Sequence, residues 1–194
     1  MKRMTPLFVA LGVCACATQA RPPPAPAPVA SAQDYYPLAV GNRWTYDTNF
    51  LGDRRERSVE IVAVRDGYYI DNEGAQLTVD GLGVRDQKRY LLRDPIQVGS
   101  AWTNVVSASS IEHYRIAEVG APCRVPAGTF ENCIRVESRN RKDEQRTLVN
   151  ELTFAPAVGI VRIELTLESG GKRVPQSVFE LKQFTLKPRA TRSP

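Results

Sequence analysis

Apolar and polar residues alternate one by one through much of this chain. Val161, Ile163, Leu165 and Leu167 fall on one side of such a run, with charged or hydroxyl side chains between them. An alternation with a period of two is typical of β strands that bury one face. The same habit returns in shorter or neighbouring runs, at residues 59–61, 77–79, 134–136 and 148–154.

Turn-forming residues separate these runs. Acidic residues precede glycine at 66–67, 73–74 and 80–81, and glycines recur at 120, 128 and 170–171. Many short strands joined by such turns predict an all-β domain with an antiparallel meander sheet, either a curved sheet or half-barrel or a sandwich. We expect little or no helix in this domain, although residues 107–119 fit neither period well.

A short segment of the chain occurs twice. Residues 37–45 and 95–103 share the pattern Pro-apolar-x-Val-Gly-x-x-Trp-Thr, and residues 156–161 are a weaker relative. The proline starts an extended segment, the glycine permits a tight turn and the tryptophan caps the core. Three explanations stay open: a recurring turn into a strand, a duplicated β unit, or chance similarity.

The first residues have the form of a secretory signal. Lys2 and Arg3 precede an apolar run at 7–13, which is about half of the ~20 residues that span a bilayer. Cys16 follows Ala15, and this arrangement resembles the lipobox of bacterial lipoproteins. The resemblance implies cleavage before Cys16, a lipid on Cys16, and sorting to the outer membrane in diderm bacteria. Ordinary cleavage further on, which would yield a soluble secreted or periplasmic protein, is the alternative.

These features divide the chain into four parts. We expect a signal peptide at 1–15, a lipid anchor and Pro/Ala-rich tether at 16–34, one β-domain at 35–187 and a disordered tail at 188–194. A proline-rich run favours an extended, semi-rigid spacer. The net charge of +5 is mild, so nucleic acid is a poor partner for this exported chain, and the basic clusters at 54–57 and 139–142 fit solvated surfaces.

Two cysteines remain after the signal and the anchor. Cys123 and Cys133 flank a turn signal at 125–130, so a hairpin centred on Gly128 would bring them opposite each other. Cross-strand neighbours in an oxidising compartment can form a disulfide. We therefore predict a Cys123–Cys133 bridge.

A wider resemblance covers most of residues 35–184. The segments 36–46, 125–133 and 154–161 look like motifs of uncharacterised exported bacterial β-proteins, many of which are lipoproteins. The resemblance implies large curved antiparallel sheets like the half-barrels of lipoprotein carriers and periplasmic lipid binders. Those carriers add helices across the concave face, and this chain has no obvious helical stretch to match them.

Candidate chemistry is sparse. His113 is the only histidine and lies in a predicted strand without a nucleophile motif nearby in sequence, so a strand position is favoured over a catalytic one. Acidic and amide side chains at 66 and 71–73 do not have calcium-loop spacing and suit turns better. We expect no metal and no cofactor. Other groups considered are the glutamates 151, 164 and 180, expected on the solvent face, and the tyrosine pairs 35–36 and 68–69, expected to pack.

Three functions remain in order of preference. The first is a non-enzymatic envelope lipoprotein that binds an envelope protein, a polymer or a lipid, or acts as a structural accessory. The second is a carrier of lipid or another hydrophobic ligand on a curved sheet, which requires apolar side chains exposed on the concave face. The third is a hydrolase, which requires His113 to meet a carboxylate and a hydroxyl in one cleft.

The anchor makes the first testable prediction. Cells that express the full chain and are fed radiolabelled palmitate should incorporate label into it, and Cys16→Ala should abolish the labelling. A wild-type chain that takes no label, or a variant that still does, would remove the lipid anchor.

Overall fold

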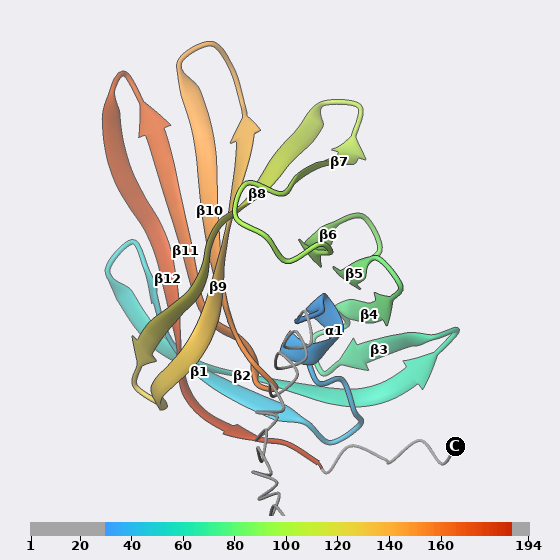
Figure 1. Ribbon diagram of the computed structural model, residues 1–194. Helices are drawn as coiled ribbons and strands as arrows, with labels where there is room; N and C mark the ends of the chain where they lie inside the picture. Colours follow the sequence, from blue (N-terminus) through green and yellow to red (C-terminus); the bar gives the residue numbers. More distant parts are fainter. Residues whose placement is uncertain (1–29, 188–194) are drawn as a thin grey trace, which may run out of the picture.

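The computed structural model describes residues 30–187, and these form one antiparallel sheet preceded by a short helix (Figure 1). The helix α1 spans Ala32–Tyr35. The sheet has twelve strands, which confirms the all-β antiparallel prediction. Their bounds are β1 (Arg43–Phe50), β2 (Asp53–Arg65), β3 (Tyr68–Asp71), β4 (Gln76–Asp80), β5 (Gly83–Arg85), β6 (Tyr90–Arg93), β7 (Ala101–Ser107), β8 (Ser110–Val125), β9 (Gly128–Arg141), β10 (Arg146–Ala155), β11 (Gly159–Ser169) and β12 (Lys172–Thr185).

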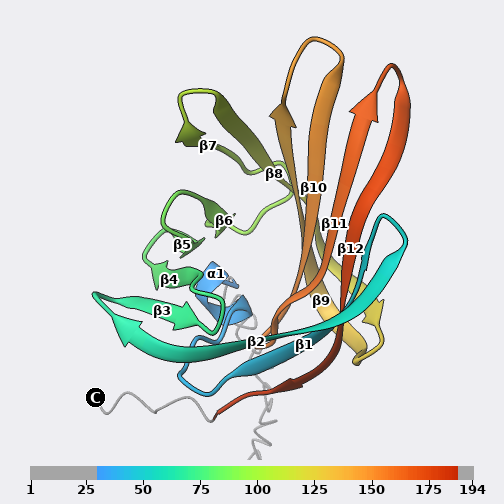
Figure 2. The same cartoon turned by 180° about the vertical axis from the view of Figure 1, so that it is seen from behind.

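The strand order makes the sheet nearly a closed barrel. Strands β1 to β6 follow one another as a first meander, β7 to β12 as a second, and β1 pairs with β12. The sheet therefore curves round on itself and leaves one open seam, between β6 and β7 (Figure 2). We call the space on its concave side the lumen. The sheet adopts the curved alternative, not the sandwich, and residues 107–119, which fitted no period, belong mostly to β8.

Side chains bridge the seam where backbone pairing stops. The Tyr90 N–H donates to Asn104 Oδ1 at 3.0 Å, and the Tyr90 carbonyl accepts from Trp102 Nε1 at 2.8 Å. Arg89 reaches across to Glu112 at 2.9 Å. An indole and a carboxamide on β7 thus satisfy backbone groups of β6 that a neighbouring strand would otherwise have to satisfy.

The lower end of the lumen is closed by α1 and the main core. Ala32 is fully buried, the Tyr35 hydroxyl donates to the Asn132 carbonyl at 2.9 Å, and the Ala157 N–H donates to the Asp34 carbonyl at 2.8 Å. Asp94 also accepts hydrogen bonds from the N-terminal side of α1. We call this closed end the base. The opposite end, where the β9–β10 and β11–β12 hairpins turn, is the mouth (Figure 1).

The helix corrects one predicted boundary. The tether was expected to run to residue 34, with the β-domain starting at Tyr35. Residues 31–34 are instead part of the folded domain, because the capping contacts of Ser31 with Asp34 and the burial of Ala32 fix them in the base. The small residues there suit close packing under the sheet as well as they suit a spacer.

The repeated segment builds the same turn twice. Gly41 and Gly99 have φ of 87° and 89°, and each donates its N–H to the carbonyl of an isoleucine, Ile61 or Ile116. A tryptophan follows three residues later at the start of β1 and near the start of β7. The recurring turn into a strand is therefore present, and each copy opens one of the two six-stranded meanders. Duplication of a β unit stays a hypothesis.

Cys123 and Cys133 form the predicted disulfide, with the two Cα atoms 6.0 Å apart. The predicted register is wrong in detail. The turn closes between Val125 and Gly128, Cys123 lies opposite Phe130, and Cys133 lies opposite Ala121. Register shifts along this hairpin, including the left-handed Asn132 with φ of 57°, bring the two cysteines together diagonally.

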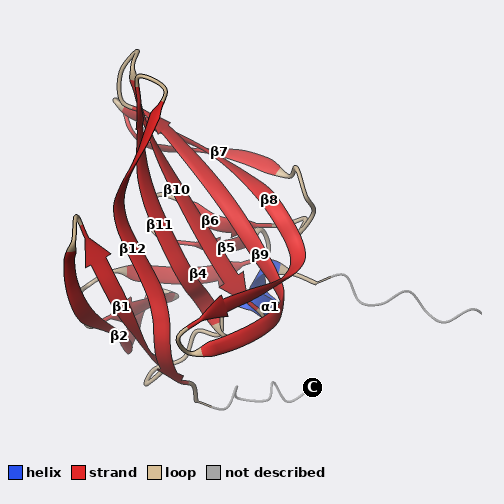
Figure 3. Ribbon diagram, turned by 90° about the vertical axis from the view of Figure 1, so that its left-hand side faces the viewer, coloured by secondary structure: helices blue, strands red, loops and turns tan. Residues whose placement is uncertain are grey.

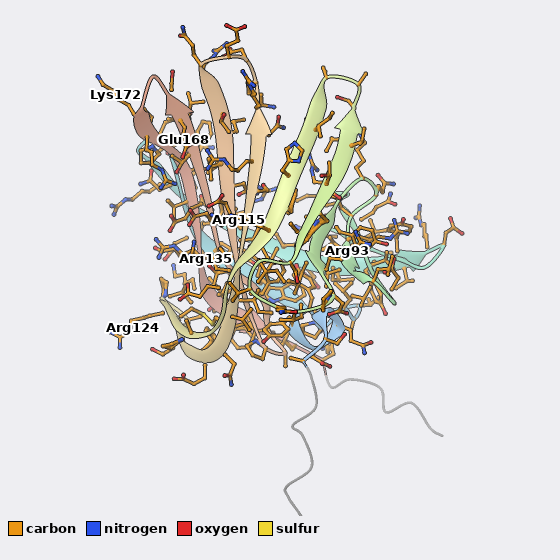
Figure 4. The ribbon with its side chains drawn as sticks, turned by 45° about the horizontal axis from the view of Figure 1, so that its top comes forward. Arg93, Arg115, Arg124, Arg135, Glu168 and Lys172 are labelled. Carbon is orange, nitrogen blue, oxygen red and sulfur yellow. A yellow bond between two sulfur atoms is a disulfide. The ribbon has the colours of Figure 1, made fainter. Side chains whose placement is uncertain are left out.

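The convex face carries a belt of ion pairs across β8 to β12, which we call the tall strands. Arg115 pairs with Glu137 across β8 and β9 at 3.1 Å, and Arg135 pairs with Glu151 across β9 and β10 at 3.7 Å. Figure 4 labels Arg115, Arg135 and Glu168 among these side chains. Exposed pairs of this kind contribute only ~0–1 kcal/mol each, so the belt chiefly keeps this face soluble. Its other pairs include Arg139–Glu168, Arg173–Glu168, Arg162–Glu180 and Lys182–Glu56.

Several predictions concern residues outside those described. The signal peptide at 1–15, the lipid on Cys16, most of the tether and the tail at 188–194 all fall there. Within residues 30–187, no helix is long and apolar enough to cross a membrane.

Two neighbouring glycines test the packing of β5 beside the seam. A Cβ on Gly83, which has φ of 151°, would lie 2.1 Å from the Leu92 carbonyl oxygen, whereas a Cβ on Gly81 would have no neighbour within 4 Å. Gly83→Ala should lower the free energy of unfolding by about 2–3 kcal/mol, measured by urea denaturation. Gly81→Ala is the matched control and should change it little. Equal effects of the two substitutions would contradict the close approach of β5 and β6.

Candidate functional site

The lumen holds a cavity of about 430 Å³ above the core of the base, within the size range of small-molecule sites. The tall strands that wall it stand side by side in Figure 3. Its lining divides into an apolar surface, mainly on β10 and β11, and a polar surface, mainly on β8 and β9, which Asn150 of β10 joins. Because side chains alternate between the faces of a strand, the lining residues of β8, β9 and β10 are all of one parity, and the residues of that parity nearer the base belong to the core.

Strands β10 and β11 supply an apolar wall. Leu152 lies opposite Ile163, and Leu148 opposite Leu167, so the inward rows of the two strands meet side by side. The inward face continues onto β12 and β1 through two exposed side chains. Val174, with 45% of its surface accessible, extends the cross-strand row of Leu148 and Leu167. Phe50, with 58% accessible, ends the row that runs from Leu165 through Ser177. The apolar residues that line the cavity itself are Leu91, Leu148, Leu152, Ile160, Ile163 and Leu165.

Strands β8 and β9 supply a polar wall. Glu112 is its centre: Oε2 accepts from the Tyr114 hydroxyl at 3.0 Å and from Arg89 Nε at 2.9 Å, and Oε1 accepts from Asn140 Nδ2 at 3.4 Å. Asn140 Nδ2 also donates to Ser110 Oγ at 2.9 Å. The polar residues that line the cavity are Arg89, Glu112, Tyr114, Ser138, Asn140, Lys142 and Asn150.

Two amide oxygens in this lining have no hydrogen-bond partner. They are Oδ1 of Asn140, a residue only 8% exposed, and Oδ1 of the half-buried Asn150. A buried acceptor without a donor costs about 1–3 kcal/mol. The residues of the lining therefore include two shielded acceptors that no described residue satisfies.

The charges in the polar wall compensate each other. Arg89 is engaged by Glu112 at 2.9 Å and by Asp86 at 3.3 Å. Burial acts to lower the pKa of the Arg89 guanidinium, but the hydrogen bonds and charges of these two carboxylates outweigh it and hold the pKa above its usual value. Burial, and then the Glu112 carboxylate, raise the pKa of Tyr114 well above its usual value. Tyr114 is therefore a neutral hydroxyl at physiological pH.

A larger depression lies outside the lumen. It has a volume of about 710 Å³ and lies between the β1–β2 hairpin and the outer side of β11 and β12. Its lining mixes acidic and basic side chains that are already paired, among them Arg55 with Asp53 and Arg162 with Glu180. It offers little unengaged chemistry, and the lumen cavity is the better candidate.

His113 lies on the convex face of β8, where it is exposed. Its Nδ1 is 3.2 Å from Thr103 Oγ1, and it shares a shallow depression with Ser109, Asp143 and Glu144. The Asp143 carboxylate is occupied by Arg146 and by backbone N–H groups of its own turn. The structure thus brings a histidine, a hydroxyl and carboxylates to one surface, but His113 hydrogen-bonds to a threonine and not to a carboxylate.

The side chains of the acidic loop at 71–73 stabilise turns of the backbone. Asp71 Oδ1 accepts from the N–H groups of Glu73 and Ala75, and Asn72 Oδ1 accepts from the Glu60 N–H. Glu73 pairs with Arg57. In the part of the chain that the structure describes, no three potential ligands gather to hold a metal ion.

The other considered residues lie where they were expected. Glu151, Glu164 and Glu180 point to the convex face and join its ion pairs. Tyr35 and Tyr36 are buried in the base, and Tyr68 packs beneath the Arg85 guanidinium, 5.3 Å from ring centre to Cζ. Cys123 and Cys133 are joined in the β8–β9 hairpin, at the base end of those strands and away from the cavity.

Sequence reasoning missed the polar wall, although a signal was present. Asn150 occupies one position in the apolar row of residues 148–154, and Asn140 continues the inward parity of Ile134 and Val136. A polar residue within an otherwise buried row indicates either a satisfied core group or a site. The basic cluster at 139–142 obscures this signal at Asn140, because its sequence neighbours on the opposite face are arginines.

Comparisons with known proteins give a loose structural likeness. No protein-family model and no curated protein matches the chain. A candidate lipoprotein from Parabacteroides distasonis is 14% identical, with a TM-score of 0.39 over 78% of this chain and 99% of its own. A candidate exported protein with a YmcC-like fold from Bacteroides fragilis is 13% identical, with a TM-score of 0.45 over the same shares.

Alkaline pH tests the burial of Tyr114. Because its pKa is raised in the folded state, Tyr114 ionises first in the unfolded chain, near pH 10. Its contribution to stability is therefore complete below about pH 10 and is lost as the pH rises further. Between about pH 10 and 12 the free energy of unfolding should fall with pH in both proteins. The slope should be steeper in the wild type than in Tyr114→Phe, by about 1.4 kcal/mol per pH unit. Urea denaturation at each pH measures this, and parallel curves would contradict it.

Proposed function

We propose that this chain is a non-enzymatic envelope lipoprotein, anchored through a lipid on Cys16, whose β-domain binds one amphipathic, lipid-like molecule in the lumen. The observation that carries the proposal is the pairing of an exposed apolar wall with a polar wall around one cavity. An enclosed core would have filled this space with side chains at crystal-like density. Here Leu165 and its neighbours on β10 and β11 face space that a ligand can occupy.

The apolar wall supplies the affinity. Each methylene that leaves water contributes ~0.8 kcal/mol. An acyl chain laid from Leu152 past Leu165 toward Val174 and Phe50 would cover side chains that water now contacts. Large exposed apolar side chains that share one concave face are unusual on a soluble surface and favour a ligand.

The polar wall supplies the orientation. A few convergent polar groups in a mostly apolar pocket fix which end of a ligand lies where. Glu112, Tyr114 and Asn140 lie together on β8 and β9, so the polar end of the ligand would lie against those strands. Its chain would lie against β10 and β11 and leave toward the mouth.

Lipid carried through purification tests this function. The full chain, isolated from its own envelope, should retain lipid that native mass spectrometry detects as a non-covalent mass. Leu165→Gln, which places an amide on the apolar wall, should weaken lipid binding about tenfold or more and so lower the retained fraction, since it removes about 1.5–3 kcal/mol of favourable apolar burial.

The matched control is Thr166→Gln on the convex face of the same strand, which should retain lipid like the wild type. A wild-type chain free of ligand, or equal retention by the two variants, would contradict the proposed function.

A further inference from the structure

We propose that the headgroup bound in the lumen is uncharged and donates hydrogen bonds through hydroxyl or amide groups, as in a glycolipid, and is not a phosphate. This inference rests on the proposed function and names the chemical class of its ligand. It comes from two independent features of the polar wall, its compensated charge and its unused acceptors.

The wall has no positive charge free to hold an anion deep in the cavity. Arg89 is engaged by both Glu112 and Asp86. The other cation of the lining, Lys142, is exposed near the mouth. A phosphate at the polar wall would instead meet the Glu112 carboxylate, and bringing two anions together in a partly buried site is unfavourable.

The unused groups are acceptors. Oδ1 of Asn140 and Oδ1 of Asn150 have no donor among residues 30–187. The orientation of the Asn140 amide is fixed, because its Nδ2 donates to Ser110 and Glu112. Its oxygen therefore lies on the side away from β8. Phosphate oxygens offer only acceptors at neutral pH, whereas hydroxyl and amide groups bring the missing donors.

The spacing suits a headgroup with donors on two sides. Asn140 lies opposite Leu148 and Asn150 lies opposite Ser138, so the two asparagines are diagonal neighbours on β9 and β10. Diagonal neighbours are about 7 Å apart, within reach of two hydroxyls of one sugar ring. Both oxygens are shielded from water, and equally from a ligand hydroxyl, in this conformation. Rotation about the broad χ2 torsion of Asn150 turns its oxygen to the ligand at little cost.

Two amphiphiles with the same chain test the headgroup. Octyl glucoside and octyl phosphate, radiolabelled and below their micellar concentrations, are equilibrated by dialysis with the full chain held in amphipol, and protein-free amphipol is the blank. Octyl glucoside should bind at least tenfold more tightly. Asn150→Leu should weaken octyl glucoside three- to tenfold, the loss of one hydrogen bond, and leave octyl phosphate unchanged.

Asn150→Gln, which keeps the acceptor, should restore much of the glucoside binding, and Thr153→Leu on the convex face of β10 is the control for folding and hydrophobicity. The inference would be overturned if octyl phosphate bound as tightly as octyl glucoside or more tightly, or if Asn150→Leu did not weaken the binding of octyl glucoside. The proposed function would stand in both cases. Binding of neither amphiphile would remove both.

Discussion

The pairing of β1 with β12 is the interaction on which the rest of the structure depends. It joins two six-stranded meanders, residues 43–93 and 101–185, into one sheet that curves almost into a barrel. Without it the two meanders would have separate edges and no common concave face. The lumen and both its walls exist because this antiparallel ladder holds the halves together. The seam between β6 and β7 has no backbone ladder, and the side chains of Trp102 and Asn104 bridge it by hydrogen bonds to the backbone of β6.

Side chains alternate between the two faces of each strand, so the sheet has a convex and a concave surface of different composition. The outward parity of the tall strands carries most of their charges and forms the ion-pair belt, with Glu137, Glu151 and Glu164 in neighbouring strands. The inward parity is apolar near the base and divides into polar and apolar walls nearer the mouth. The base is a sealed core built on Trp44 and Phe154, which are almost fully buried. The cavity begins where that core ends, so stability and binding occupy different ends of the same strands.

The sequence carried much of this organisation. The alternation of residues 148–154 and 161–168 and the turn glycines predicted the antiparallel strands, and the repeated tryptophan segment marked the start of each meander. Cys123 and Cys133 were correctly paired, although the shifts in register between them depend on backbone bulges that no local pattern shows. The polar wall was missed because it forms only when β8, β9 and β10 lie side by side. Glu112, Asn140 and Asn150 are unremarkable where they stand in sequence, and only the register brings them to one cavity.

The central claim is that the lumen holds an amphipathic ligand whose polar end lies against β8 and β9. A crystal structure of the full chain, purified from its own envelope without added amphiphile, tests it most directly. The account predicts continuous density for an apolar chain along Leu165 toward the mouth, with a polar group within hydrogen-bond distance of Asn140 or Asn150. A lumen that contains only ordered water, with those two amide oxygens satisfied by it, would contradict the account.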